Sequence, residues 1–330
     1  MKKLIAIALC ALITLVVFTA CVQDQNGQAD AVNPDNHNPV TIGIIQMMEH
    51  PSLDLIRETF IAEMRALGYT DVNFEHRNGV GADMTVLTTI AQTFVGNHVD
   101  MIVAIATPAA QAAAATTSDI PILFAAITNP IAAGLVDDLQ NPDANITGTS
   151  DKICVESIFD FALELVPDAT TFGLVYNLGE VNSVASINEA KALLTARGLR
   201  YREAPVMGTA YVQQAALSLV GHVDAFFTPT DNTVAAAMPV FAQVAIDAGI
   251  PIFTGADSMV MDGGLATVGI DYAILGAETA RMASRILAGT PISEVPVATM
   301  QDFRTIVNRE TAAAIGVSIY NLPAYVEIYP

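Results

Sequence analysis

The chain has 330 residues, of which 52% are hydrophobic, 15% are charged and 6% are aromatic, and it contains no Trp. Its formal net charge is −20, from 14 Lys and Arg against 34 Asp and Glu residues. This length allows roughly two domains with ample cores, and the acidic balance makes nucleic-acid phosphates and anionic lipid surfaces poor partners.

The N-terminus carries the longest apolar run of the chain. Two lysines precede an apolar run over residues 4–18. A spanning helix needs about 20 apolar residues and the hydrophobic region of a signal peptide about 7–15, so the run fits a signal peptide. The small residues before Cys21 resemble the lipobox of bacterial lipoproteins, although Phe18 replaces the usual Leu. The resemblance implies a signal peptide over 1–20 and a diacylglyceryl group on the sulfur of Cys21. An uncleaved anchor or an ordinary secretory signal is the alternative, and in each case the remaining chain is exported.

The exported part is expected to be an acidic soluble body behind a tether. Residues 21–39 are rich in Gln, Asn, Asp, Gly and Pro, which predicts a flexible coil. Removing the two signal lysines changes the net charge from −20 to −22. Cys154 is the single Cys left in the folded part, so an internal disulfide is excluded and a structural thiol is favoured. We expect a protein held on the extracytoplasmic face of the cell membrane by its N-terminal lipid.

From residue 40 onward, short apolar runs alternate with helical patterns. The expected elements are strands at 41–46, 99–106 and 121–126 and helices at 53–67, at 84–97 and from Pro108. Continuous apolar strands between helices predict mainly parallel sheets that helices cover on both faces.

The second half of this body repeats landmarks of the first. Gly43 and Gly68 recur as Gly173 and Gly198, with a separation of 25 residues in both cases. Any two α/β units share some features, but several further landmarks recur in the same order, which favours a duplication. The pattern therefore predicts two similar α/β lobes with a cleft between them.

The loops that follow the strands are rich in polar side chains, although the chain is poor in charge. In open α/β sheets ligands bind outside the carboxyl ends of the strands, where these loops lie. The candidate ligand-binding residues are Gln46, Glu49, Thr107, Ala109, Ala110, Thr128, Asn129, Tyr176, Asn177, Glu180, Asn182, Ser183, Asp231, Asn232, Asp257, Asp271 and Tyr272. Few basic residues accompany them, which favours a ligand with an ammonium group or many hydroxyls over a phosphate or polyanion. No metal or cofactor is expected, and His50 is interpreted as a hydrogen-bonding group because no second His lies at ligand spacing.

Four motifs together resemble the ABC transporter substrate-binding family that includes tryptophan- and tyrosine-binding lipoproteins. The motifs are Ala104–Gln111, Tyr176–Ser183, Pro229–Asn232 and Gly269–Tyr272, with Glu49–Pro51 ahead of them. The family's Asp in the loop after the fourth strand is Asn129 here, which leaves the fine ligand preference open.

This resemblance implies the type I periplasmic-binding-protein fold, with two similar lobes, mainly parallel sheets, three crossovers and an interlobe cleft. We expect crossovers near Asp151, Asp271 and Pro296. The expected boundaries are 40–150 plus 272–295 for the N-terminal lobe and 151–271 plus 296–330 for the C-terminal lobe.

The resulting hypothesis is a monomeric receptor that captures an α-amino acid, preferably an aromatic one, and delivers it to an ABC permease and its ATPase. The ligand carboxylate would bind the N–H groups of Ala109 and Ala110 and the hydroxyl of Thr107, the expected N-cap. The ligand ammonium would meet Glu180 or Asp231.

Other side chains have supporting roles in this hypothesis. Glu49 is a further candidate for the ammonium, and the amides or hydroxyls of Asn177, Ser183 and Asn232 would complete the hydrogen bonds. The candidate walls for an aromatic ring are Tyr176, Tyr272 and Met47.

Two alternatives remain open. The same fold could bind a sugar or nucleoside, although a sugar site usually sandwiches the ring between aromatic side chains and this chain has no Trp. An exported enzyme is disfavoured because the sequence has no nucleophile elbow, metal constellation or Gly-rich phosphate loop.

Overall fold

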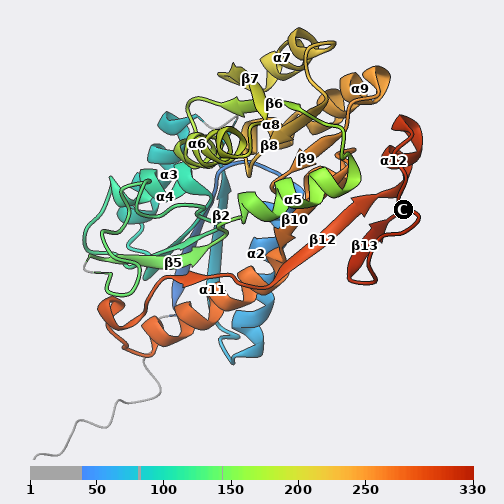
Figure 1. Ribbon diagram of the computed structural model, residues 1–330. Coiled ribbons are helices and arrows are strands. Elements are labelled where there is room, and N and C mark those ends of the chain that lie inside the picture. Colours follow the sequence, from blue (N-terminus) through green and yellow to red (C-terminus); the bar gives the residue numbers. More distant parts are fainter. Residues whose placement is uncertain (1–38, 81–82, 143) are drawn as a thin grey trace, which may run out of the picture. The chain divides into compact units, whose positions relative to one another are not determined.

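The computed structural model describes residues 39–80, 83–142 and 144–330 (Figure 1). The expected signal peptide, the lipid acceptor Cys21 and nearly all of the expected tether lie outside the described residues. Within the part that is described, no helix is both long and apolar enough to cross a membrane.

The first sheet has six strands in the order β11-β5-β4-β3-β1-β2, and all neighbours pair in parallel. Its strands are β1 (Thr41–Gln46), β2 (Asn73–Asn78), β3 (Met101–Ile105), β4 (Ile122–Ala125), β5 (Ile146–Ser150) and β11 (Ala298–Thr299). The helices between them are α2 (Pro51–Ala66), α3 (Met84–Gly96) and α4 (Thr107–Ala114). The apolar runs of β3 and β4 are buried at every residue, as parallel strands between two helix layers require.

The second sheet has seven strands in the order β13-β12-β10-β9-β8-β6-β7, and only β12 runs antiparallel to its neighbour β10. Its strands are β6 (Thr171–Asn177), β7 (Arg200–Val206), β8 (Ala225–Thr228), β9 (Ile252–Thr254), β10 (Ala266–Ile270), β12 (Phe303–Asn308) and β13 (Val326–Tyr329). Its helices are α5 (Val155–Leu165), α6 (Val181–Ala196), α7 (Val212–Leu219), α8 (Asn232–Ala236), α9 (Met238–Ala248), α10 (Asp257–Met261) and α12 (Arg309–Ile315).

The two sheets share one topology. The order β2-β1-β3-β4-β5 in the first sheet recurs as β7-β6-β8-β9-β10 in the second. Strands β1 and β6 begin at Thr41 and Thr171, and helices α2 and α6 begin at Pro51 and Val181, an offset of 130 residues in both cases. The expectation of two similar lobes with mainly parallel sheets is therefore confirmed.

The repeated glycines serve the same purpose in both lobes. A Cβ atom added at Gly43 would lie 2.5 Å from the ring of Phe94, and one added at Gly173 would lie 2.8 Å from the ring of Phe226. Each glycine thus leaves room for a buried aromatic ring against the first strand of its lobe. The recurrence reflects packing, which supports a duplication over a chance similarity.

The chain passes between the sheets three times. It leaves the first sheet at Asp151 and returns at Asp271, where α11 (Tyr272–Leu287) begins and packs along α2 (Figure 1). Strand β11 then pairs with β5, and β12 pairs with β10. The last passage therefore lies at 300–302, several residues after the expected boundary between 295 and 296, because a two-residue strand leaves no recognisable sequence pattern.

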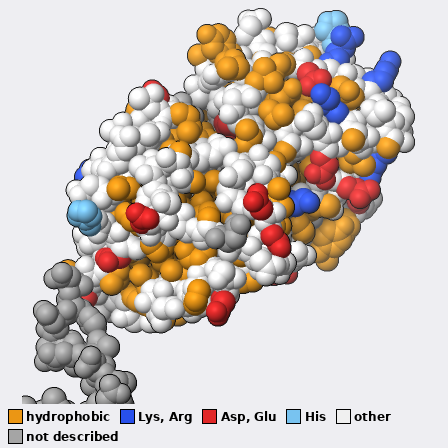
Figure 2. All heavy atoms as spheres, turned by 90° about the vertical axis from the view of Figure 1, so that its left-hand side faces the viewer, with side chains coloured by type: hydrophobic (Ala, Val, Ile, Leu, Met, Phe, Trp, Pro, Cys, Tyr) orange, Lys and Arg blue, Asp and Glu red, His pale blue; other side chains and the backbone are white. Residues whose placement is uncertain are grey.

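Charge is sparse on the outside of the molecule. Figure 2 shows a face on which apolar and uncharged side chains predominate and most of the Lys and Arg side chains lie toward the upper right. On the second lobe, the exposed Arg200, Arg202 and His222 line one shallow hollow. Part of the acidic excess is buried where the lobes meet, at Asp151 and Asp231.

Candidate functional site

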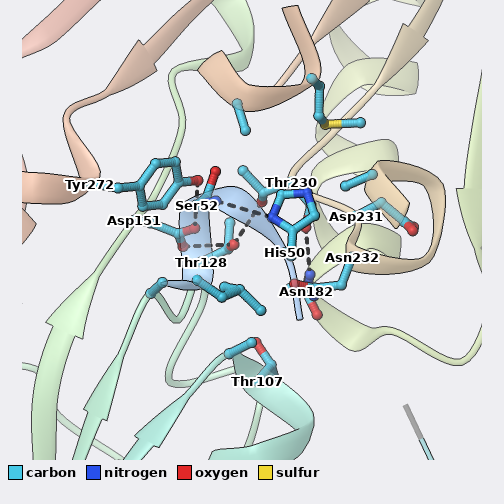
Figure 3. A pocket seen from close by; sticks show the side chains of 16 residues that line it. His50, Ser52, Thr107, Thr128, Asp151, Asn182, Thr230, Asp231, Asn232 and Tyr272 are labelled. Carbon is cyan, nitrogen blue, oxygen red and sulfur yellow. Dashed lines mark hydrogen bonds between the residues drawn. The ribbon is translucent and has the colours of Figure 1, made fainter. Parts of the chain in front are cut away.

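A pocket lies between the carboxyl ends of the two sheets, and we call it the interlobe pocket. The empty space between its side chains, including the part open to solvent, is about 400 Å³, and its cavity volume is about 30 Å³. Figure 3 shows Asp151 on one side of it and Asn182 on the other, with His50 on the side of Asn182. Its lining residues are His50, Ser52, Leu53, Ala106, Thr107, Ala126, Thr128, Asp151, Asn182, Thr230, Asp231, Asn232, Ala235, Ala256, Met259 and Tyr272.

Two hydroxyl pairs join the lobes at this pocket. The hydroxyl of Ser52 in α2 donates to the hydroxyl of Ser258 in α10, with 2.7 Å between the oxygens. The hydroxyls of Thr128 and Thr230 are 2.9 Å apart. Because each pair has one member on each lobe, the lobes are in direct contact around the pocket.

Asp151 lies buried at the first crossover. Its carboxylate accepts hydrogen bonds from the hydroxyl of Thr128 at 2.9 Å and from the phenol of Tyr272 at 3.4 Å. Burial raises the pKa of Asp151 to about 6, and the two donors limit this rise. A cationic group placed in the pocket would favour the ionised form of this carboxyl.

His50 is the N-cap of α2 and points into the pocket (Figure 3). Its Nδ1 accepts a hydrogen bond from the backbone N–H of Ser52 at 3.3 Å. Burial lowers the pKa of His50 to about 4, so the ring is neutral near pH 7. Its other nitrogen, Nε2, is buried and has no hydrogen-bond partner among the described residues.

Asn182 and Asp231 line the side of the pocket that the second lobe supplies. The Nδ2 atom of Asn182 donates to the carbonyl of Thr230 at 2.9 Å, while its Oδ1 is buried without a partner among the described residues. Asp231 accepts backbone N–H groups from Asn177 at 2.6 Å and Val234 at 2.8 Å. Burial and the neighbouring carboxylate of Glu180 raise the pKa of Asp231.

The backbone is strained at two points of the lining. Ala106 follows β3 with a φ of 76°, and Ala126 follows β4 with a φ of 58°. The left-handed region is costly for residues other than Gly, and such strain concentrates at ligand sites. At both residues the chain turns sharply between the end of a strand and the wall of the pocket. The side chain at each of these turns is only a methyl group.

Apolar side chains close the rest of the pocket. Leu53, Met259 and the ring of Tyr272 are the large ones, and four alanines keep the remaining wall shallow. Within the described residues no Lys or Arg lines the pocket. Such a wall suits a flat apolar group, and a thioether like that of Met259 makes favourable contacts with aromatic rings.

Six of the predicted ligand-binding residues line the interlobe pocket, and their contact with a ligand stays a prediction. They are Thr107, Thr128, Asn182, Asp231, Asn232 and Tyr272. The other eleven predicted residues lie outside this lining, and most have a structural partner there.

The start of α4 differs from the prediction. Ala106 is the N-cap, Thr107 is the first helical residue, and no side chain caps this helix. The N–H of Ala110 donates to the carbonyl of Ala106 at 3.1 Å, so it is not free for a ligand. Ala109 and Ala110 are fully buried in the core. The left-handed turn at Ala106 starts the helix one residue earlier than the pattern predicted.

Glu180 and Asn177 stabilise the N-terminus of α8. The carboxylate of Glu180 accepts the N–H groups of Asn232 at 3.0 Å and Thr233 at 2.9 Å. The side chain of Asn177 donates to the hydroxyl of Thr233 at 2.7 Å. The carboxylate of Glu180 is thus occupied by the free N–H groups of a helix end, which is a frequent use of carboxylates in loops.

A wider groove, which we call the outer groove, lies between the lobes beside the interlobe pocket. Three of the predicted residues, Met47, Asn177 and Glu180, face it. Its lining is completed by Met48, Met84, Pro108, Gln111, Gly179, Met207, Gly208, Thr209 and Thr233.

Tyr176 is not a wall of either cavity. It lies in β6, and its phenol donates to Glu203 at 2.8 Å. Neighbouring Val175 belongs to a different apolar cluster from Tyr176, because successive side chains of a strand point to opposite faces. Tyr176 therefore packs on the face of its sheet where α5 and α6 lie.

Three predicted residues of the first lobe are held elsewhere. Gln46 accepts a hydrogen bond from Arg57 at 2.8 Å and donates to Asp54 at 2.9 Å. Glu49 is exposed and accepts from the side chain of Asn78 at 3.4 Å. Asn129 is exposed, and its Oδ1 accepts the backbone N–H of Ala132 at 3.0 Å.

Three predicted residues of the second lobe also have local roles. Asp271 is the N-cap of α11 and pairs with Arg304 at 3.3 Å. Asp257 accepts the N–H of Ser258 at 2.7 Å, and burial raises its pKa. Ser183 is fully buried beside the carboxylate of Asp231.

The sequence analysis missed several lining residues, among them Ser52 and Thr230. The internal duplication contains a sequence signal that could have identified both residues. Ser52 and Asn182 are each the second residue of the helix after the first strand of their lobe, and Thr107 and Thr230 each lie two residues after a strand end. Transferring the predicted Asn182 and Thr107 to the other lobe would have identified them. Among the residues that the structure describes, no group of three or more His, Cys, Asp and Glu side chains is placed to hold a metal ion.

Comparisons with known proteins identify the type of chain. The family described as ABC transporter substrate binding protein matches residues 41–322. The Tyrosine-binding protein of Clostridioides difficile strain R20291 is 34% identical over 319 residues, which cover 95% of this chain and 92% of that protein.

Two solved structures extend the similarity. An ABC domain from Streptococcus pneumonia in complex with L-Trp is 34% identical, with a TM-score of 0.83 over 86% of this chain and 97% of that chain. The ligand-free, open structure of a substrate binding protein with adhesive properties from Clostridium difficile is 36% identical, with a TM-score of 0.69 over 88% of this chain and 99% of that chain.

Proposed function

Because the chain belongs to the family of ABC transporter substrate-binding proteins, we propose that it captures an α-amino acid with an aromatic side chain in the interlobe pocket and delivers it to a membrane permease and its ATPase. The family implies an extracytoplasmic protein whose task is binding, and its solved relatives are binding proteins. We propose that it acts as a monomer and needs no cofactor.

The observation that carries this proposal is the chemistry of the pocket lining. Two buried carboxylates, Asp151 and Asp231, lie on opposite sides, and no described cation accompanies them. A ligand with an ammonium group would complement this charge, whereas a phosphate would be repelled. The apolar wall of Leu53, Met259 and alanines suits a ring.

The ligands of two relatives support the same class. The Tyrosine-binding protein of Clostridioides difficile and the L-Trp complex from Streptococcus pneumonia are each 34% identical to this chain. The TM-score is higher against the L-Trp complex than against the ligand-free, open relative, at 0.83 and 0.69. Together with the hydroxyl pairs between the lobes, this difference supports a closed arrangement in which both lobes touch the ligand.

We also propose the lobe division that the sheets suggest. The first lobe would comprise residues 40–150 with 272–299, and the second 151–271 with the chain from residue 303. Opening about the three passages between the sheets would admit the ligand.

A thermal-shift screen of the chain from residue 22 onward tests the ligand class. The screen uses the twenty amino acids, a set of sugars and a set of nucleosides. Stabilisation by tyrosine, tryptophan or phenylalanine, growing with the excess of ligand over Kd, is the expected result. A response to sugars or nucleosides alone would overturn the proposal in favour of the alternative ligand class.

Attachment by a lipid at Cys21 is a separate proposal, which rests on the lipobox-like residues before this Cys. A single lipid anchor would keep the receptor near its permease. In cells, Cys21→Ala is expected to move the protein from the membrane fraction to the soluble fraction, while Cys154→Ala leaves it in the membrane fraction. Retention of the Cys21→Ala variant would contradict lipidation at this position.

A further inference from the structure

We propose that His50 and Asn182 set the direction in which an amino acid lies in the interlobe pocket. The neutral imidazole of His50 donates its Nε2–H to the ligand carboxylate, and the Oδ1 of Asn182 accepts a hydrogen bond from the ligand ammonium. This assignment rests on the proposed function and names the groups that recognise the two charged ends of the ligand. It replaces the N–H groups of α4 that the sequence suggested.

The tautomer of His50 follows from its cap. A backbone N–H is always a donor, so the Nδ1 that receives the N–H of Ser52 at 3.3 Å carries a lone pair. The proton of the neutral ring is therefore on Nε2. His50 is 6% exposed and lines the pocket, and Nε2 has no partner among the described residues. A buried donor that faces a pocket is expected to bond to an acceptor on the ligand.

The amide of Asn182 has one possible orientation. Its donating end must be the nitrogen that lies 2.9 Å from the carbonyl of Thr230, because two oxygens could not share a hydrogen bond there. The oxygen is left as a buried acceptor without a partner among the described residues. Asn182 is 4% exposed and lines the same pocket as His50. It therefore complements a donor on the ligand.

Charge favours the ammonium on the side of Asn182. Figure 3 shows Asp231 and Asn182 on the same side of the pocket, and Asp231 also lies beside the carboxylate of Glu180. The resulting negative potential attracts a cation and repels a carboxylate. Asp151 is a single carboxylate on the opposite side, with hydrogen bonds from Thr128 and Tyr272, whereas Asp231 and Glu180 place two carboxylates on the side of Asn182. The carboxylate of the ligand is left to the uncharged donor of His50.

Ligands that lack either the carboxylate or the ammonium group can test the roles of His50 and Asn182 separately. Calorimetry compares L-tyrosine with tyramine, which has no carboxylate, and with 3-(4-hydroxyphenyl)propionate, which has no ammonium. If the wild type prefers L-tryptophan, the matching set is tryptamine and indole-3-propionate. The variants are His50→Asn, whose amide can still cap α2 but lacks the Nε2–H, and Asn182→Ala.

The expected result is a crossed pattern. His50→Asn weakens L-tyrosine binding roughly 10- to 100-fold, as for a lost hydrogen bond to a charged group, and changes tyramine binding by less than about 3-fold. Asn182→Ala weakens L-tyrosine to a similar extent and leaves 3-(4-hydroxyphenyl)propionate nearly unaffected. Equal losses for all three ligands, no loss, or the opposite pattern would overturn the assignment.

Failure of the proposed ligand orientation can be distinguished from failure of the proposed function. If the wild type binds aromatic amino acids without the crossed pattern, only the orientation is wrong. If the wild type binds no amino acid, both the proposed function and the proposed orientation are wrong. Circular dichroism and the melting temperature of each ligand-free variant establish that a loss of binding is not a loss of fold.

Discussion

The hydroxyls of Ser52 and Ser258 meet across the two lobes with 2.7 Å between their oxygens, although they are 206 residues apart in the sequence. Ser52 lies in the first turn of α2, and Ser258 lies in α10. Both are almost completely buried. The proposed opening of the lobes would break this bond, so we expect it to favour the closed form in the balance between closed and open forms.

Ser52→Ala is expected to shift this balance toward the open form. The net value of a neutral hydrogen bond predicts an affinity for the amino acid that is roughly 3- to 10-fold weaker. Small-angle scattering of the ligand-free variant should give a larger radius of gyration than the wild type. Ser218→Ala is the matched control, because this exposed hydroxyl bonds only within α7. Unchanged affinity and radius in Ser52→Ala would contradict a role in closure.

Asp151 is expected to make the protein less stable as pH rises. Its pKa is raised from 3.8 to about 6, so between these values the folded chain keeps a proton that the unfolded chain has lost. The free energy of unfolding therefore falls by on the order of 2 kcal/mol between pH 4.5 and pH 7 on account of this group. Urea denaturation of Asp151→Asn should show that this fall is missing. Parallel pH profiles of wild type and variant would contradict the assignment.

His50 has the opposite effect on how the free energy of unfolding depends on pH. Its pKa is lowered from 6.5 to about 4, so between these values the unfolded chain binds a proton that the folded chain does not. The free energy of unfolding is therefore expected to rise by on the order of 2 kcal/mol between pH 4.5 and pH 7. In the wild type the two groups offset each other. The stability of His50→Asn should fall with pH relative to the wild type, and that of Asp151→Asn should rise, which makes each variant the control of the other.

Gly276 permits the close contact of α11 with α2. A Cβ atom at this position would lie 2.7 Å from the carbonyl oxygen of Ile56 and would also overlap the hydroxyl of Thr59. Gly276→Ala is expected to destabilise the protein by roughly 1–3 kcal/mol, as overpacking does. Gly96→Ala, where the added methyl meets open space at the end of α3, is expected to be neutral or slightly stabilising. Thermal denaturation of both variants checks the contrast.

Most of the fold could be predicted because its causes are local. The apolar run of residues 41–46 became β1, and the helical spacing after Pro51 became α2. The position of the third crossover could not be predicted, because β11 exists only through its pairing with β5. Nothing in residues 298–299 themselves distinguishes a strand from a loop.

The site could be predicted only as a set of loops. Polarity marks Glu180 and Asp231 equally, but only Asp231 lines the interlobe pocket, whereas Glu180 faces the outer groove and holds the N–H groups of α8. Whether a carboxylate serves a helix end or a ligand depends on contacts across the lobe, which spacing along the chain does not contain. His50 was interpreted as a hydrogen-bonding group but was not among the predicted ligand-binding residues, because its free nitrogen is defined by the bond that its other nitrogen makes.

The offset of 130 residues between the lobes also relates the two walls of the pocket. His50 and Glu180 are the N-caps of α2 and α6, and Ser52 and Asn182 follow them at the same spacing. Two identical halves would present the same group to both ends of a bound molecule, as a homodimer does around its twofold axis. An amino acid has unlike ends, so holding it in one direction requires these paired positions to differ. Ser52 and Asn182 both line the pocket, and the difference between these paired positions is the departure from pseudo-twofold symmetry that the proposed ligand, with its unlike ends, would require.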